Sequence, residues 1–156
     1  SGRGPAPAEY DHDWADVKGD DELWRYLNEK KYEMMREYLQ RGEPVQFRSS
    51  GNSLSPLVYL GDICFLWPIM AGVTNIGPGD IVSCHVQPGN RFCVHLVWMV
   101  DYYMQKNGVE KQYFIIGNNR KEGEGRKQNG WCYLEHVYGI LVKTQRGLHQ
   151  RPAAPA

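Results

Sequence analysis

The sequence of 156 residues lacks the features that would place it among membrane-spanning proteins. No apolar run reaches the roughly 18 residues needed to cross a bilayer. The longest, Ile63–Val73, is interrupted by Pro68 and Gly72. No apolar segment follows Arg3 near the N-terminus, so we expect no secretory signal peptide. The composition therefore predicts one soluble domain without a transmembrane segment, and it leaves the cellular compartment unknown.

The chain also lacks net charge, since 18 basic residues balance 18 acidic ones. Its densest basic stretch, residues 120–127, contains two glutamates and no aromatic residue. Nucleic-acid-binding surfaces combine clustered basic residues with aromatic side chains that stack on bases. We therefore expect a solvated loop here and no nucleic-acid partner.

Cysteine is scarce, and the four cysteines form no CxxC pair. Structural zinc and thioredoxin-like chemistry are therefore not expected. Cys64, Cys84 and Cys93 lie within apolar runs, which favours reduced, buried thiols, with two disulfides in an exported protein as the alternative. The chain has no GxGxxG, Walker, HExxH or GxSxG motif, so we predict neither a cofactor nor a metal.

Four regions follow from the pattern of residues. Residues 1–19 show no periodicity and predict an extended arm, and residues 147–156 predict a flexible tail. Between them, residues 20–43 predict an amphipathic helix of about Asp21–Arg41, which Gly42 and Pro44 end. Residues 44–146 form the β region.

The β region alternates short apolar runs with Gly, Pro, Asn and Asp, which predicts strands joined by turns. Asn107-Gly108 is a strong hairpin signal, and Pro88–Asn90 is a second turn. We interpret residues 118–131 as a loop with Trp131 packed beneath it. The expected fold is a curled antiparallel sheet or partly open barrel. Its strands are Val45–Arg48, Ile63–Trp67, Asp80–Val86, Phe92–Tyr103, Gln112–Ile116 and His136–Lys143.

Six short motifs are informative through the order in which they occur. They are Gly51-Asn52-Ser53-Leu54-Ser55-Pro56, Leu60-Gly61-Asp62, Gly79-Asp80-Ile81-Val82, Val94-His95-Leu96-Val97, Gly117-Asn118-Asn119 and Val137-Tyr138-Gly139. In this order, residues 35–143 resemble the serine peptidase superfamily of type I signal peptidases and LexA-like self-cleaving repressors. Its usual pattern is GxSMxP, two Gly-Asp pairs before strands, a Lys or a His-Arg pair, then GDN. The resemblance implies a LexA-type β fold and peptide-bond cleavage.

By this resemblance Ser53 would be the nucleophile and His95 the general base. A serine hydroxyl is a weak nucleophile until a base takes its proton, and imidazole titrates near neutral pH. The substrate would be an extended peptide paired with a strand edge, or the chain's own N-terminal arm. The residues expected to contact it are Gly51, Leu54, Pro56 and Leu57.

Supporting roles fall to Asp62 and Asp80, which we expect to cap turns, and to Asn118. Three substitutions depart from the family pattern: Leu54 replaces Met, Leu96 replaces Arg, and Asn118 replaces the Asp of GDN. Taken alone, Ser53 fits an ordinary turn and His95 a packed histidine, and His85 is a rival base. The alternative function is therefore a catalytically inactive peptidase-like scaffold that binds a protein partner within a larger assembly.

Overall fold

The computed structural model describes residues 21–70, 73–121 and 123–146, with residues 21–28 described through their backbone alone. The predicted arm, residues 1–19, and tail, residues 147–156, lie outside these ranges. The described elements are one α-helix, seven strands and one short 3-10 helix. They are α1 Asp21–Gln40, β1 Val45–Arg48, β2 Ile63–Pro68, β3 Ile81–Val86, β4 Arg91–Gln105, β5 Gly108–Ile116, β6 Gln128–Tyr133, η3 Leu134–His136 and β7 Val137–Gln145.

All seven strands belong to one antiparallel sheet with the order β1-β2-β7-β3-β4-β5-β6. The prediction of a mainly β chain with one helix is confirmed. Both predicted hairpin turns are present, between β3 and β4 and between β4 and β5. The sheet does not close into a barrel, and within the described ranges β1 and β6 are its edges.

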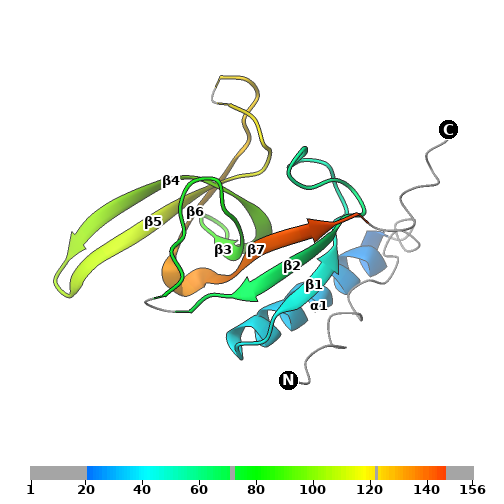
Figure 1. Ribbon diagram of the computed structural model, residues 1–156, viewed down its shortest axis with the longest axis horizontal. Coiled ribbons are helices and arrows are strands. Elements are labelled where there is room, and N and C mark those ends of the chain that lie inside the picture. The colour runs from blue at the N-terminus through cyan, green and yellow to red at the C-terminus, as the bar shows by residue number, and fades with distance from the viewer. Residues whose placement is uncertain (1–20, 71–72, 122, 147–156) are drawn as a thin grey trace.

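The helix packs along the part of the sheet formed by β1, β2 and β7 (Figure 1). Its buried side chains are Lys31, Met35 and Leu39, which recur every four residues and so lie on one face. The helix ends at Gln40, and the chain then turns at Gly42, whose φ of +85° is a left-handed conformation that glycine adopts without strain. Together these features direct the chain from the helix into β1.

Two hydrophobic clusters stabilise the sheet. The first lies between α1 and the sheet and includes Met35, Leu39, Val45 and Leu66. The second lies within the curved half of the sheet and contains Val82, Cys84, Val86, Val97, Tyr113, Ile115 and Cys132. At the end of this half, Gln87 and Trp131 exchange backbone hydrogen bonds of 2.7 and 2.9 Å. Gly130 has a φ of +128°, and a Cβ there would overlap the Gln87 carbonyl oxygen. Glycine is therefore required at this close approach.

One part of the predicted fold is wrong. Residues 128–131, interpreted as the end of a loop, belong to β6, which pairs with β5 because Cys132 is buried in the second cluster. The Asn-Gly pair within this strand concealed it, since such pairs are typical of turns.

The alternation of side chains typical of a strand is interrupted in β4 near Trp98. A bulge lies between Val97 and Met99, so Val97 and Val100 pack against the same cluster. Strict alternation would place these two valines on opposite faces.

Within the described residues, no helix is long and apolar enough to span a membrane.

Candidate active site

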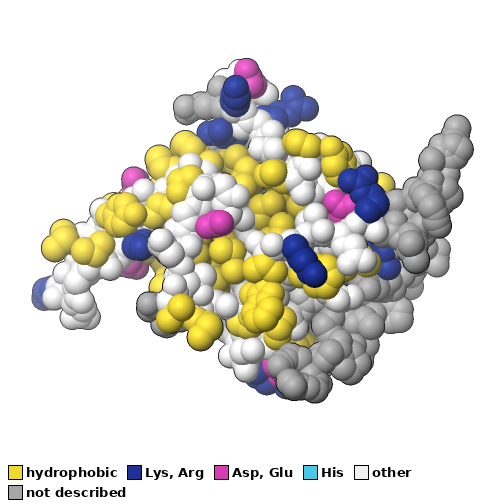
Figure 2. Space-filling view, viewed as in Figure 1, with side chains coloured by type: hydrophobic (Ala, Val, Ile, Leu, Met, Phe, Trp, Pro, Cys, Tyr) yellow, Lys and Arg dark blue, Asp and Glu magenta, His cyan; other side chains and the backbone are white. Residues whose placement is uncertain are grey.

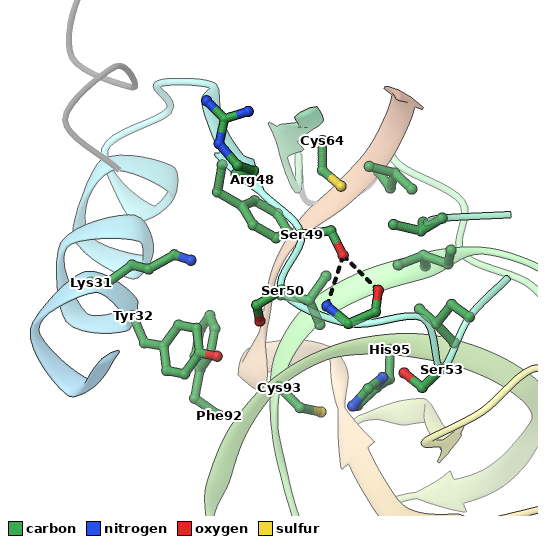
Figure 3. Close-up of a pocket in the computed structure, with 17 residues that line it drawn as sticks. Lys31, Tyr32, Arg48, Ser49, Ser50, Ser53, Cys64, Phe92, Cys93 and His95 are labelled. Carbon is green, nitrogen blue, oxygen red and sulfur yellow. Dashed lines mark hydrogen bonds between the residues drawn. The ribbon is translucent and has the colours of Figure 1, made fainter. Parts of the chain in front are cut away.

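A cavity of about 260 Å³ lies where the helix, the chain after β1 and the start of β4 meet. Its walls come from Lys31 and Tyr32 of α1, from residues in the range 47–54, and from residues 92–95 of β4. Figure 3 shows these side chains around the cavity, with Ser53 and His95 both in its wall. The fold therefore brings together the two predicted catalytic residues, which are separated by more than 40 positions in the sequence.

Ser53 is exposed and lies in the connection between β1 and β2, residues 49–62, here called the serine loop. The neck of this loop is closed by hydrogen bonds from the Ser49 N–H to the Asp62 carbonyl and from the Gly61 N–H to the Ser49 carbonyl, both 2.8 Å. Leu54 is buried in the first hydrophobic cluster. The next residue after Ser53 therefore anchors the loop while Ser53 itself faces outward.

A second loop, residues 117–127, holds the serine loop from the other side. The Asn119 N–H donates to the Ser53 carbonyl at 2.9 Å, and the Asn119 side-chain amide donates to the Ser55 carbonyl at 3.3 Å. Asn119 was not among the predicted site residues. Its position in the Gly-Asn-Asn motif was visible in the sequence, but its partners lie more than 60 residues away.

His95 is half-buried on β4. Burial, followed by the positive charges of Lys127 and Arg91, lowers its pKa from 6.5 to about 4. Its Nδ1 is buried and has no hydrogen-bond partner within the described structure. The ring is therefore neutral at pH 7 and able to accept a proton, but none of the described residues that line the cavity is a carboxylate that could fix its orientation.

Asn118 does not supply this missing support. Its side-chain amide donates to the Gly125 carbonyl at 2.9 Å, and its carbonyl oxygen accepts from the Lys127 N–H at 2.9 Å. Both bonds close the 117–127 loop upon itself. Asn118 thus shapes the loop that carries Asn119, and it acts on His95 only indirectly.

The two predicted turn aspartates lie ahead of β2 and β3. Asp62 accepts a hydrogen bond from the Tyr59 N–H at 2.8 Å and forms an ion pair with Arg146 at 3.2 Å. Asp80 accepts from the Gly77 N–H at 2.8 Å. Neither residue lines the cavity, so both act by holding turns.

The predicted substrate-contacting residues divide into two groups. Gly51 and Leu54 line the cavity, whereas Pro56 and Leu57 do not. Both of the latter are exposed on the far part of the serine loop, because the Leu57 N–H turns back to the Leu54 carbonyl at 2.9 Å. The predicted contact of Pro56 and Leu57 with substrate in the cavity is therefore not supported.

His85, the rival base, lies outside the cavity lining. Its Nδ1 is 2.6 Å from the Tyr138 hydroxyl, and its ring packs edge-on against Phe92 and Tyr138. Burial also lowers the pKa of His85. His85 therefore contacts Tyr138 and Phe92 and does not line the cavity that contains Ser53.

The start of β4 offers an unpaired backbone edge. Residues 91–96 pair with β3 on one side, while pairing with β5 begins only at Leu96. In the described part of the chain, no strand covers the other edge of residues 91–95. This edge and residues 49–51 of the serine loop both border the cavity.

The positively charged part of the cavity wall was not predicted from the sequence. Lys31 is only 4% exposed and lies 5.4 Å from the centre of the Phe47 ring, and Arg48 lines the same region. None of the residues lining the cavity is Asp or Glu. Lys31 shares the spacing of Met35 and Leu39, so helical periodicity could have indicated that it faces inward.

Comparison of the chain with protein-family models, with curated proteins and with solved structures finds no match in any of the three. The geometry of the cavity therefore carries the functional argument.

Proposed function

We propose that this chain is a serine endopeptidase of the signal-peptidase and LexA-like type, which cleaves an extended peptide with a Ser53–His95 dyad. One observation carries the proposal: an exposed serine and a neutral histidine from distant segments line a single cavity (Figure 3). Nucleophile and base in adjacent positions are the minimum that acyl transfer requires.

In the proposed reaction His95 removes the proton from the Ser53 hydroxyl as its oxygen attacks the peptide carbonyl carbon. The imidazolium then donates this proton to the leaving amine, and water releases the acyl group with His95 again acting as base. The described structure contains no hydrogen bond between the two side chains. Catalytic hydrogen bonds are often long without substrate, so the ring must move toward Ser53 as peptide binds.

The same features limit the expected rate. Burial and two nearby positive charges hold the pKa of His95 at about 4, which makes it a weak base. No carboxylate stabilises the imidazolium that forms, and the Nδ1 is without a partner among the described residues. A base with a low pKa and no supporting carboxylate gives only slow turnover. Slow turnover is sufficient for self-cleavage or for cleavage of a tightly bound peptide.

Peptide binding is supported by the free edge of residues 91–95. An extended peptide can add to such an edge through main-chain hydrogen bonds, while a pocket accepts one of its side chains. Leu54, Val58 and Leu141 supply an apolar part of the wall, and Lys31 and Arg48 supply positive charge. The favoured peptide therefore presents an aliphatic side chain to the apolar part of the cavity.

A second candidate function, a peptidase-like subunit that binds a protein partner, is favoured by a different observation. The β4–β5 hairpin extends from the body of the molecule (Figure 1). Hydrophobic side chains gather on it (Figure 2), where Met104 is 81% exposed and Tyr102 65% exposed. Exposed apolar groups of this size are typical of binding surfaces.

The proposal is tested by incubating the chain with a library of extended peptides and identifying products by mass spectrometry across pH 5 to 9. We expect products with the unaltered chain and none with Ser53→Ala or His95→Gln. Ser50→Ala is the matched control, because Ser50 lines the same cavity and should leave hydrolysis intact. Intact mass of the chain itself reports self-cleavage in the same samples. Equal product yields from Ser53→Ala and the unaltered chain would overturn the proposal, and an absence of products from both would favour the binding subunit.

A further inference from the structure

Three of the four cysteines form one cluster beside the cavity. Cys84 on β3 and Cys93 on β4 are directly opposite cross-strand partners, with their Sγ atoms 3.8 Å apart. Cys132 on β6 lies within hydrogen-bonding reach of Cys84. All three are free thiols; Cys84 and Cys132 are fully buried, whereas Cys93 is half-buried and lines the cavity. Of these three thiols, Cys93 is therefore the first that an oxidant entering the cavity meets, and Cys64, which also lines the cavity, is only 2% exposed.

The surroundings of Cys93 favour its thiolate. A hydrogen bond from Cys84 lowers the pKa of Cys93, and so do a hydrogen bond from the Asn129 side chain and the positive charge of Arg91, while burial acts in the opposite direction. Hydrogen bonds with Cys132 and Cys93, together with burial, raise the pKa of Cys84. The pair thus combines an accessible, acidic thiol with a buried, protonated one, the usual division between attacking and resolving cysteines.

From this geometry we propose that Cys93 is an oxidative modification site, which a hydroperoxide converts to a sulfenic acid that Cys84 resolves to a disulfide. In the first step the Cys93 sulfur attacks the terminal peroxide oxygen. An S–O bond forms, the O–O bond breaks, and the alcohol or water leaves with the proton. In the second step the Cys84 sulfur attacks the Cys93 sulfur, an S–S bond forms, and the S–O bond breaks as hydroxide leaves and takes the Cys84 proton. Sulfur is oxidised and peroxide is reduced, two electrons in all.

The backbone already meets the requirement for this bond. Directly opposite residues in an antiparallel pair have Cα atoms about 4.5 to 5.5 Å apart. A disulfide accepts Cα separations of roughly 4.4 to 6.8 Å, so side-chain rotation suffices to close it. Cys132 is excluded as the first residue to react because it is fully buried.

The modification would also change the proposed active site. Cys93 and His95 are two residues apart on β4, so their side chains leave the same face of the strand, and both line the cavity. Oxygen on the Cys93 sulfur, or its withdrawal toward Cys84, alters the wall next to the imidazole. This consequence rests on the proposed function, whereas the oxidation itself does not.

The test treats the folded chain with a slight excess of hydrogen peroxide, blocks free thiols and maps the cysteines after chymotrypsin digestion, which separates Cys64 from Cys84. We expect a Cys84–Cys93 linked peptide. In Cys84→Ser the sulfenic acid persists, so dimedone labels Cys93. In Cys132→Ser, the matched buried control, the Cys84–Cys93 link still forms. A Cys84–Cys132 link, or the absence of any dimedone label in folded Cys84→Ser, would overturn the proposal.

A second measurement needs no variant. In the untreated folded chain we expect iodoacetamide to alkylate Cys93 at least about tenfold faster than each other cysteine, because only Cys93 combines exposure with thiolate character. Burial raises the pKa of Cys64 to about 12, which makes it the internal reference. Equal alkylation rates for Cys93 and Cys64 would overturn the proposal, whatever the peptide-hydrolysis assay shows, because thiol chemistry alone is measured.

Discussion

Replacing His95 by glutamine is expected to flatten the pH dependence of stability between pH 6.5 and 4. Burial and the positive charges of Lys127 and Arg91 hold the folded-state pKa of His95 at about 4, against an ordinary 6.5. Between these values the unfolded chain binds a proton that the folded chain does not, so stability falls as the pH falls. A pKa difference of about 2.5 corresponds to about 3 kcal/mol at ~1.4 kcal/mol per pKa unit.

The assay is urea unfolding of the unaltered chain and of His95→Gln at pH 7 and pH 4.5. Most of the protonation penalty has developed by pH 4.5, so the unaltered chain should lose about 2 kcal/mol more than the variant over this interval. Comparing the two losses cancels the contributions of other titrating groups. Ser53→Ala is the control, because it retains His95 and should lose as much stability as the unaltered chain. Equal losses for His95→Gln and the unaltered chain would refute the assigned pKa and, with it, a neutral buried base.

Three further outcomes are expected. Asn119→Ala should lower peptide hydrolysis about fivefold in a steady-state assay, because it removes a hydrogen bond worth roughly 1 kcal/mol that holds the serine loop. Asp62→Ala should lower the free energy of unfolding in urea by about 2 kcal/mol, since it leaves a part-buried N–H unpaired. Gly130→Ala should lower the melting temperature more than Gly108→Ala: both glycines have φ above +120°, but only a Cβ at Gly130 would overlap the Gln87 carbonyl oxygen. Equal melting temperatures for the two glycine variants would contradict that close approach.

Much of the fold could be predicted because its signals are local. The helix is visible from the spacing of its apolar residues, and Asn107-Gly108 encodes a hairpin by itself. β6 and the bulge in β4 are different, because tertiary contacts decide them. Cys132 is buried in the second cluster, and its neighbours therefore pair with β5, although Asn129-Gly130 is typical of a turn.

The candidate site was predictable only in part. The order of short motifs suggested Ser53 and His95, and the structure places them in one cavity. Asn119 and Lys31 reach the same region through contacts with distant parts of the chain, which no single segment encodes. The proximity of Cys93 to Cys84 could not be predicted, because it depends on the register in which β3 pairs with β4.

The measurement that tests the central claim most directly is the site of reaction with a phosphonofluoridate, which phosphonylates serines that a neighbouring base activates. Peptide mapping of the treated chain should find one adduct, on Ser53, and none in His95→Gln. The serine loop supplies internal controls, since Ser49 and Ser50 line the same cavity. An unmodified Ser53, or equal labelling of all three serines, would contradict a Ser53–His95 dyad.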